Sequence, residues 1–142
     1  MRIRQITIVG LGLIGGSLGM AVKRRRLASK VVGFSRRPAT LRQALRRRAI
    51  DEGTGDLARA VQPADLVVLA TPVVQIVPLA RRCARLMRPG SVLTDVGSTK
   101  RAIVSALRNL PRGVAFGGGH PVAGSERRGL GAADAGLFDG SL

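Results

Sequence analysis

The stretch Ile6-Thr-Ile-Val-Gly-Leu-Gly-Leu-Ile-Gly-Gly-Ser-Leu18 places three spaced glycines between an apolar run and the beginning of a helical pattern. Gly10, Gly12 and Gly15 form G-x-G-x-x-G directly after a strand-like segment, which is the context that a dinucleotide-binding turn requires. We expect Gly10 to permit a tight turn, Gly12 to let the backbone approach a pyrophosphate, and Gly15 to let helix and strand pack closely. The N–H groups that begin the helix then face the phosphates. The predicted cofactor contacts in this turn are Gly10, Gly12, Leu13, Ile14 and Gly15.

Apolar runs alternate with helical patterns along the rest of the chain. After the strand that precedes Gly10, strand-like segments cover 31–35, 65–70, 91–96 and 113–116, and the polar stretch 51–56 is predicted to be a loop. This alternation predicts an α/β domain over 1–142 with a Rossmann-type, doubly wound parallel sheet. The predicted inward helix faces are Ile14, Leu18, Ala21 and Val22; Leu41, Ala44, Leu45 and Ala49; Val73, Ile76, Val77, Ala80, Ala84 and Met87; and Ala102, Ile103, Ala106, Leu107 and Leu110. Pro78 conflicts with the third of these helices and predicts a kink or a later start.

Composition limits the class of protein. The 142 residues suit one domain with a real core, and no apolar run approaches the ~20 residues of a membrane span. The chain enters a strand almost at once, so we expect no signal peptide. The single cysteine, Cys83, excludes an internal disulfide and favours a reducing cytoplasm. We interpret Cys83 as a packing residue on a helix, and we predict no metal site.

The formal net charge of +16 is unusual and raises the question of a nucleic-acid partner. Against such a partner, the chain has no Trp or Tyr, so platforms for base stacking are nearly absent. The arginines also fall where helix surfaces and helix ends are predicted. We therefore favour an arginine-rich solvated surface, with no specific nucleic acid and no membrane as partner. A second interpretation is that the positive field attracts an anionic cofactor and substrate.

Five segments follow predicted strands and should meet at one crevice, because ligands of such sheets bind beyond the carboxyl ends of the strands. They are 10–15, 35–37, 71–73, 97–99 and 119–124. At the end of the second strand, where NAD-binding proteins usually carry an acidic residue, this chain has Ser35, Arg36 and Arg37. A hydroxyl and guanidinium groups bind a 2′-phosphate that a carboxylate would repel. We therefore favour NADP as cofactor; NAD stays possible, since the arginines are also typical of an arginine-rich surface.

Four motifs resemble the nucleotide-binding domain of the prephenate/arogenate dehydrogenases of tyrosine biosynthesis. They are G-L-G-L-I-G-G-S-L at 10–18, A-T-P-V at 70–73, D-V-G-S-T-K at 95–100 and G-G-H-P-V-A-G-S-E at 118–126, with Gly129 shortly after. Their order and spacing match, and the resemblance covers nearly the whole chain. The first motif is generic to Rossmann enzymes, whereas the third and fourth are much more specific. The implied reaction is an oxidative decarboxylation of a cyclohexadienol, which yields an aromatic ring.

The resemblance assigns roles to individual residues. His120, the only histidine, matches the catalytic position, and imidazole suits the transfer of a hydroxyl proton. Ser98 matches a serine that lies near the nicotinamide and contacts the substrate hydroxyl or the histidine, although a serine there also suits a helix N-cap. Asp95 is interpreted as a hydrogen-bonding residue at a strand end. The resemblance further places Thr71, Pro72 and Val73 at the nicotinamide end, although a strand-ending turn would look the same, and Gly97 is predicted as a cofactor contact. It places Ser125 and Glu126 beside the substrate; Glu126 also suits an ion pair with Arg127 or Arg128.

The chain departs from the family pattern at its end. Members of the family continue with a helical domain that forms a dimer and supplies arginine contacts to the substrate, so we expect 1–142 to be an incomplete domain whose full-length form is a homodimer. Alone it should bind nucleotide but turn over little substrate, because the reacting atoms are not positioned. Two alternatives remain open: an NADP-binding module without turnover, and a β-hydroxyacid-type dehydrogenase domain. The sequence does not distinguish prephenate from arogenate.

Overall fold

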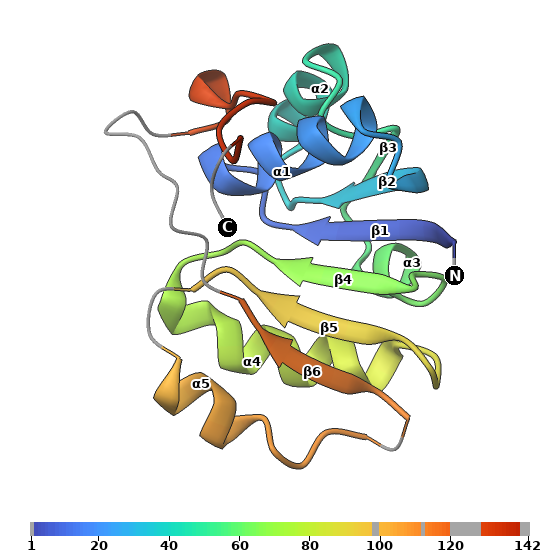
Figure 1. The fold of residues 1–142 in the computed structure, drawn as a ribbon, viewed down its shortest axis with the longest axis vertical. Helices are drawn as coiled ribbons and strands as arrows, with labels where there is room; N and C mark the ends of the chain where they lie inside the picture. Colours follow the sequence, from blue (N-terminus) through green and yellow to red (C-terminus); the bar gives the residue numbers. More distant parts are fainter. Residues whose placement is uncertain (1, 98–99, 112, 120–128, 140–142) are drawn as a thin grey trace.

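A computed structural model describes residues 2–97, 100–111, 113–119 and 129–139. Six parallel strands form one sheet in the order β3-β2-β1-β4-β5-β6 (Figure 1). The strands are β1 (Ile3–Val9), β2 (Ala28–Phe34), β3 (Glu52–Thr54), β4 (Leu66–Leu69), β5 (Val92–Asp95) and β6 (Ala115–Gly118). The helices are α1 (Leu13–Arg24), α2 (Pro38–Arg46), α3 (Leu57–Val61), α4 (Val73–Leu86) and α5 (Arg101–Ala106), with a 3₁₀ turn η1 (Leu130–Ala132). The predicted doubly wound parallel sheet is confirmed.

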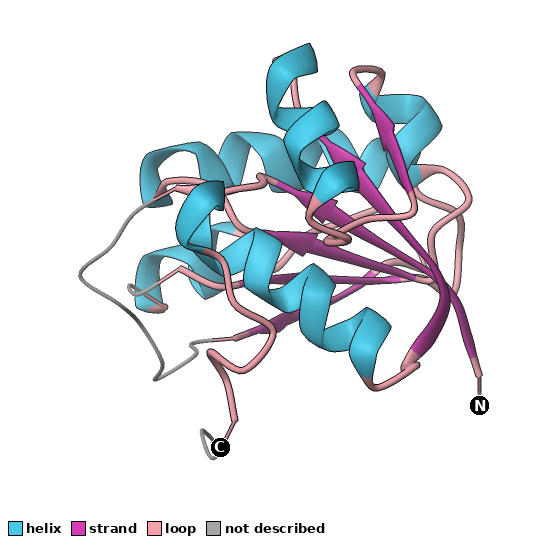
Figure 2. Ribbon diagram, turned by 90° about the horizontal axis from the view of Figure 1, so that it is seen from above, coloured by secondary structure: helices cyan, strands magenta, loops and turns pink. Residues whose placement is uncertain are grey.

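Helices cover both faces of the sheet (Figure 2), and each face has its own apolar core. Successive strand residues point to opposite faces, so Val31 and Val68 join the core beneath α1 and α2, whereas Val32 and Val67 join the core beneath α3 and α4. Strands buried on both sides are therefore nearly continuous apolar runs, which is why their sequence gives a clear signal. The two cores hold the carboxyl ends of β1, β2, β4 and β5 at one edge.

The buried face of α1 differs from the predicted one. Val22 is buried as expected, but Ile14 and Ala21 are only partly covered, and the buried positions include Gly15, Gly16 and Gly19. A Cβ built on Gly19 would lie 2.1 Å from the carbonyl oxygen of Ala49. The helix therefore approaches its neighbours by backbone contact, which a search for large apolar residues does not detect.

Other details of the elements differ from the expectations. The predicted loop 51–56 contains the short edge strand β3, whose residues are largely exposed and so lack an apolar alternation. Leu45, Val73 and Ala102 were assigned to inward faces but are exposed. Pro78 does not delay α4, which begins at Val73 and continues to Leu86. The last strand also extends into glycines, since Gly117 and Gly118 pair with β5 through their backbones.

The segment after Gly129 folds back onto α1. Leu130 and Ala133 are buried, and a Cβ built on Gly16 would lie 2.5 Å from Leu130 Cδ1. The Asp134 N–H donates to Ser17 Oγ at 2.9 Å. At the end of this segment, hydrogen bonds from Arg24 and Arg25 hold the pKa of Asp139 below its usual value. The contact extends the core beneath α1 toward the carboxyl-terminal part of the chain.

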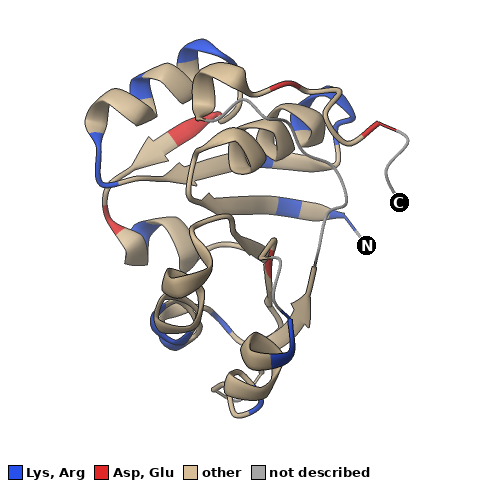
Figure 3. Cartoon of the chain, turned by 90° about the vertical axis from the view of Figure 1, so that its left-hand side faces the viewer, with Lys and Arg blue, Asp and Glu red and all other residues tan. Residues whose placement is uncertain are grey.

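Basic residues are spread over helices and turns rather than gathered in one patch in the view of Figure 3. Several are paired with carboxylates, as in the contacts Lys23–Asp51 at 3.1 Å and Lys30–Glu52 at 3.2 Å. Within the described part of the chain, no helix has the length and apolar character needed to cross a membrane.

Candidate nucleotide-binding site

The turn between β1 and α1 has the geometry that its glycines predict. Gly10 has a φ of +103°, and a Cβ there would lie 2.6 Å from the Ala70 carbonyl oxygen. A Cβ on Gly15 would lie 1.9 Å from the carbonyl oxygen of Gly10, so only glycine lets the helix pack this closely. A Cβ on Gly12 would meet nothing within 4 Å. Packing thus requires Gly10 and Gly15, whereas the space at Gly12 is open to a ligand.

The beginning of α1 is suited to an anion. Gly12 is the N-cap and provides no side-chain hydrogen bond, and the first turn of the helix contains no acidic residue. The N–H groups of Leu13 and Ile14 lie in this first turn, where no helical carbonyl precedes them to accept a hydrogen bond. Together with the positive end of the helix dipole, such groups favour a phosphate. The turn therefore fits the pyrophosphate of a dinucleotide.

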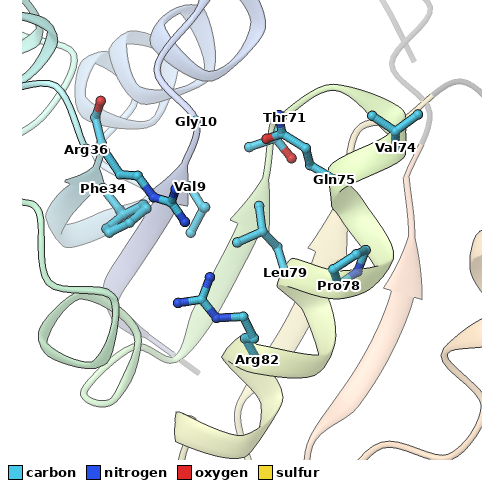
Figure 4. Close-up of a pocket in the computed structure, with 11 residues that line it drawn as sticks. Val9, Gly10, Phe34, Arg36, Thr71, Val74, Gln75, Pro78, Leu79 and Arg82 are labelled. Atoms are coloured by element: carbon cyan, nitrogen blue, oxygen red, sulfur yellow. The ribbon is translucent and has the colours of Figure 1, made fainter.

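A cleft of about 530 Å³ opens beside this turn (Figure 4). One wall comes from the ends of β1 and β2, with Gly10, Phe34 and Arg36, and the other comes from α4, with Leu79 and Arg82. Apolar side chains form much of the lining, as expected for a site that holds an aromatic base. Among the described residues that line the cleft, none is acidic.

Ser35 and Arg36 lie at the end of β2, on the cleft. The Ser35 hydroxyl oxygen accepts a hydrogen bond from the Arg37 N–H at 3.1 Å, which leaves its own proton free to be donated. Arg36 extends its guanidinium group into the cleft (Figure 4), whereas Arg37 is the N-cap of α2 and does not line the cleft. The structure thus brings Ser35 and Arg36 together with the glycine turn and leaves Arg37 to one side.

The end of β4 brings one of its three predicted contacts to the cleft. Thr71 lines it, and Thr71 Oγ1 is buried without a hydrogen-bond partner among the described residues. Pro72 is the N-cap of α4, and Val73 begins that helix; neither lines the cleft. Polar atoms that are buried without a partner are uncommon and mark places where a ligand or water completes the bonding.

Asp95 connects the segments that follow β5 and β6. This side chain is fully buried, and its Oδ2 accepts hydrogen bonds from the Gly97 N–H at 2.8 Å and from the Lys100 ammonium group. Its backbone carbonyl accepts from the Gly119 N–H at 3.1 Å. Asp95 is therefore a hydrogen-bonding residue at a strand end, as predicted. Four predicted site residues lie outside the described residues: Ser98, His120, Ser125 and Glu126.

Two neighbouring residues of α4, Cys83 and Arg82, lie in different environments, and the helical pattern predicted only the first. Cys83 is buried in the core, and burial raises the pKa of its thiol to about 12 despite the neighbouring Arg82. This confirms Cys83 as a packing residue, since a thiol with so high a pKa is a poor nucleophile. Arg82, assigned from the sequence to a solvated face, lines the cleft. Its spacing from Gln75 and Leu79, at i+7 and i+3, places all three on one helix face beside the strand ends.

The parallel sheet, the glycine turn and the cleft at the carboxyl edge define a dinucleotide-binding domain of the Rossmann class. The family model described as prephenate dehydrogenase, nucleotide-binding domain, matches residues 18–142. Prephenate dehydrogenase from Lactococcus lactis is 35% identical in an alignment 139 residues long that covers 96% of this chain. The chain therefore belongs to the prephenate dehydrogenase family, of which it represents the nucleotide-binding domain.

Solved structures agree with this assignment. Prephenate dehydrogenase from Aquifex aeolicus, in complex with hydroxyphenyl propionate and NAD⁺, superposes with a TM-score of 0.89 at 30% identity over 99% of this chain. Arogenate dehydrogenase from Synechocystis has a TM-score of 0.84 at 35% identity over 96%. This chain spans 39% of the Lactococcus protein and 49% and 48% of these two structures.

Proposed function

We propose that this chain binds NADP and forms the cofactor-binding part of a dehydrogenase that converts prephenate or arogenate by oxidative decarboxylation. Membership of the family supports the reaction class. The observation that carries the cofactor preference is the end of β2, where Ser35 and Arg36 line a cleft without an acidic lining residue among those described. Two features there favour a 2′-phosphate: a hydroxyl that is free to donate, and a guanidinium group that binds phosphate with two parallel hydrogen bonds.

The cofactor would lie along the carboxyl edge of the sheet. The backbone at Gly12 and the start of α1 would hold the pyrophosphate, because that space is open and the N–H groups are available. The cleft beside Arg36 would hold the adenosine. Thr71 would lie between these parts and the nicotinamide, with Pro72, Val73 and Gly97 nearer to that ring. When bound, the nicotinamide supplies the acceptor for the hydride of the substrate carbinol.

The remaining chemistry belongs to the protein and the substrate. In the proposed reaction, His120 takes the hydroxyl proton as the carbinol becomes a carbonyl, and Ser98 hydrogen-bonds at that hydroxyl. The electron pair of the breaking C–C bond then enters the ring as carbon dioxide leaves, and the former carbonyl oxygen takes the proton back from His120 and becomes the hydroxyl of a phenol. Ser125 and Glu126 would border the substrate. The proposal includes neither a nucleic acid nor a membrane as partner, and it expects a cytoplasmic homodimer for the full-length form.

The first test is binding. Titration of the chain with NADPH and with NADH, followed by calorimetry at one ionic strength, should give a Kd at least about tenfold lower for NADPH. Equal affinities would contradict the NADP preference while leaving the reaction class intact. No binding of either cofactor would contradict the assignment as a working nucleotide domain.

The second test concerns His120. In a form that carries the helical domain of the family, His120→Asn should lower turnover of prephenate or arogenate by about 10²–10⁴, which is the usual contribution of a positioned base. NADPH affinity should stay within about twofold, because the imidazole acts on the substrate. Unchanged turnover would remove His120 from the mechanism.

A further inference from the structure

A second arginine faces Arg36 across the cleft. Arg36 reaches in from the end of β2, and Arg82 reaches in from α4, so that the two guanidinium groups point toward the same space from opposite walls (Figure 4). The two residues are 46 positions apart in the sequence, and only the fold brings them to one cleft. Both are exposed, and neither takes part in a side-chain hydrogen bond or ion pair with another described residue.

The surroundings give these two charges no internal partner. The described lining of the cleft combines apolar side chains such as Phe34 and Leu79 with the polar side chains of Ser35, Thr71 and Gln75, and it includes no carboxylate. The two positive charges repel one another, and a partly apolar surface strengthens this repulsion because it lowers the local dielectric constant. A dianionic group placed between them would convert this repulsion into two attractions.

We propose that Arg82 is a specificity-determining residue, which binds the 2′-phosphate of NADP from the α4 side while Arg36 and Ser35 bind it from the β2 side. This inference rests on the proposed use of NADP. It adds a contact from the opposite wall, so that the 2′-phosphate is held between two arginines rather than at one loop. The ribose 2′-position of an NAD molecule offers no anion, so Arg82 would contribute little to NAD binding.

The position of Arg82 on α4 lets it bind a phosphate without contributing to the packed core. Its neighbour Cys83 packs into the core, whereas the Arg82 side chain is exposed and lines the cleft. Arg85 provides a matched control, since it lies on the same helix, is also exposed, and lines a separate hollow near Asn109 and Pro111. Loss of either arginine lowers the net charge by the same amount, whereas of the two only Arg82 lines the cleft.

The test compares the variants Arg82→Gln and Arg85→Gln with the unaltered chain. Each is titrated with NADPH, NADH, 2′,5′-ADP and 5′-AMP at one ionic strength. We expect Arg82→Gln to weaken NADPH and 2′,5′-ADP about tenfold and to change NADH and 5′-AMP less than about twofold. Arg85→Gln should change all four Kd values less than about twofold. Far-UV circular dichroism checks that each variant is folded.

The outcomes separate this inference from the proposed function. If the unaltered chain prefers NADPH and Arg82→Gln keeps that preference, the role of Arg82 is wrong and the proposed cofactor stands. If Arg82→Gln weakens all four ligands equally, Arg82 acts on the adenine or the pyrophosphate, and specificity is not its role. If the unaltered chain binds NADH as tightly as NADPH, or binds neither, the proposed cofactor fails and the role of Arg82 fails with it.

Discussion

The two edges of the sheet use their polar groups differently. At the amino edge, Asp65 precedes β4 and accepts hydrogen bonds from the Arg4 and Gln5 N–H groups at 2.8 and 3.1 Å, while its other oxygen contacts Arg88. At the carboxyl edge, Thr71 Oγ1 and Asp95 Oδ1 are buried without a hydrogen-bond partner among the described residues. Within the described part of the chain, both oxygens of Asp65 therefore have partners, whereas these two atoms at the carboxyl edge have none.

This difference shows where the fold provides stability and where it provides binding. Buried polar atoms without partners destabilise a fold, so their presence at one edge calls for a specific reason. The same edge contains the open space at Gly12 and the helix start without a side-chain cap. We infer that the carboxyl edge is incompletely bonded because a ligand completes it.

The largest effect is expected at Gly15, where the carboxyl edge is closely packed. Gly15→Ala would place a methyl group 1.9 Å from the Gly10 carbonyl oxygen, and a backbone atom cannot move aside as a flexible side chain can. We expect the free energy of unfolding to fall by more than about 3 kcal/mol. Urea unfolding followed by circular dichroism at 222 nm measures this change, since the chain contains no Trp. An unchanged midpoint would show that helix α1 is free to shift away from the turn.

The next effect is expected at the buried carboxylate. Lys100→Met removes the cation beside Asp95, which is fully buried and whose side chain then keeps, among the described residues, the hydrogen bond from the Gly97 N–H. We expect a loss of about 2–3 kcal/mol, because an uncompensated buried charge remains. The double variant Asp95→Asn/Lys100→Met should recover at least about 1 kcal/mol of this loss. If the two substitutions are simply additive, Lys100 does not stabilise the strand end through Asp95.

The sequence predicted those parts of the fold that a local pattern of residues identifies. Apolar runs marked the strands buried on both faces, and the spacing of Gly10, Gly12 and Gly15 marked the turn. The rule that strand ends converge brought Ser35, Arg36 and Thr71 together before any coordinates, and the cleft confirms that these three lie together.

The features that were missed depend on contacts between distant residues. Gly16 and Gly19 lie in the α1 interface because Leu130 and Ala49 approach them, and no local pattern identifies those partners. Arg82 is one of many arginines in the sequence, and only the proximity of α4 to the end of β2 distinguishes it. Strand β3 forms because its backbone pairs with that of β2. Its own sequence, Glu-Gly-Thr, does not predict a strand.

A smaller effect is expected at the amino edge, and it depends on pH. Burial alone would raise the pKa of Asp65, but the N–H groups of Gln5 and Arg4 and the charge of Arg88 outweigh it and hold the pKa below its usual value. Because the folded pKa lies below the unfolded one, Asp65 stabilises the fold fully above the unfolded pKa of about 3.9. That stabilisation is lost as the pH falls through the folded pKa.

Asp65→Asn should therefore lower the free energy of unfolding by about 1–2 kcal/mol at pH 7, since hydrogen bonds to a charged group are lost. The difference from the unaltered chain should stay constant down to about pH 5 and shrink below about pH 4. Urea unfolding at pH 7, 5, 4 and 3 measures it. NADPH affinity at pH 7 should not change, because Asp65 lies at the edge opposite the cleft. A difference that grows on acidification would contradict the assigned direction of the pKa.

The smallest effect on stability, and the most informative one for the comparison of edges, is expected at Gly12. Gly12→Ala adds a methyl group to open space, because a Cβ built there has no atom within 4 Å apart from its chain neighbours. The cost should be below about 1 kcal/mol, the usual penalty for alanine in place of glycine at an N-cap. The same methyl group occupies the space that a pyrophosphate needs, so NADPH affinity should fall at least about tenfold. Gly15→Ala and Gly12→Ala thus separate packing from binding within one turn. If Gly12→Ala binds NADPH normally, the open space at Gly12 does not hold the phosphates. A different ligand would then be needed to explain the unpaired polar atoms described at that edge.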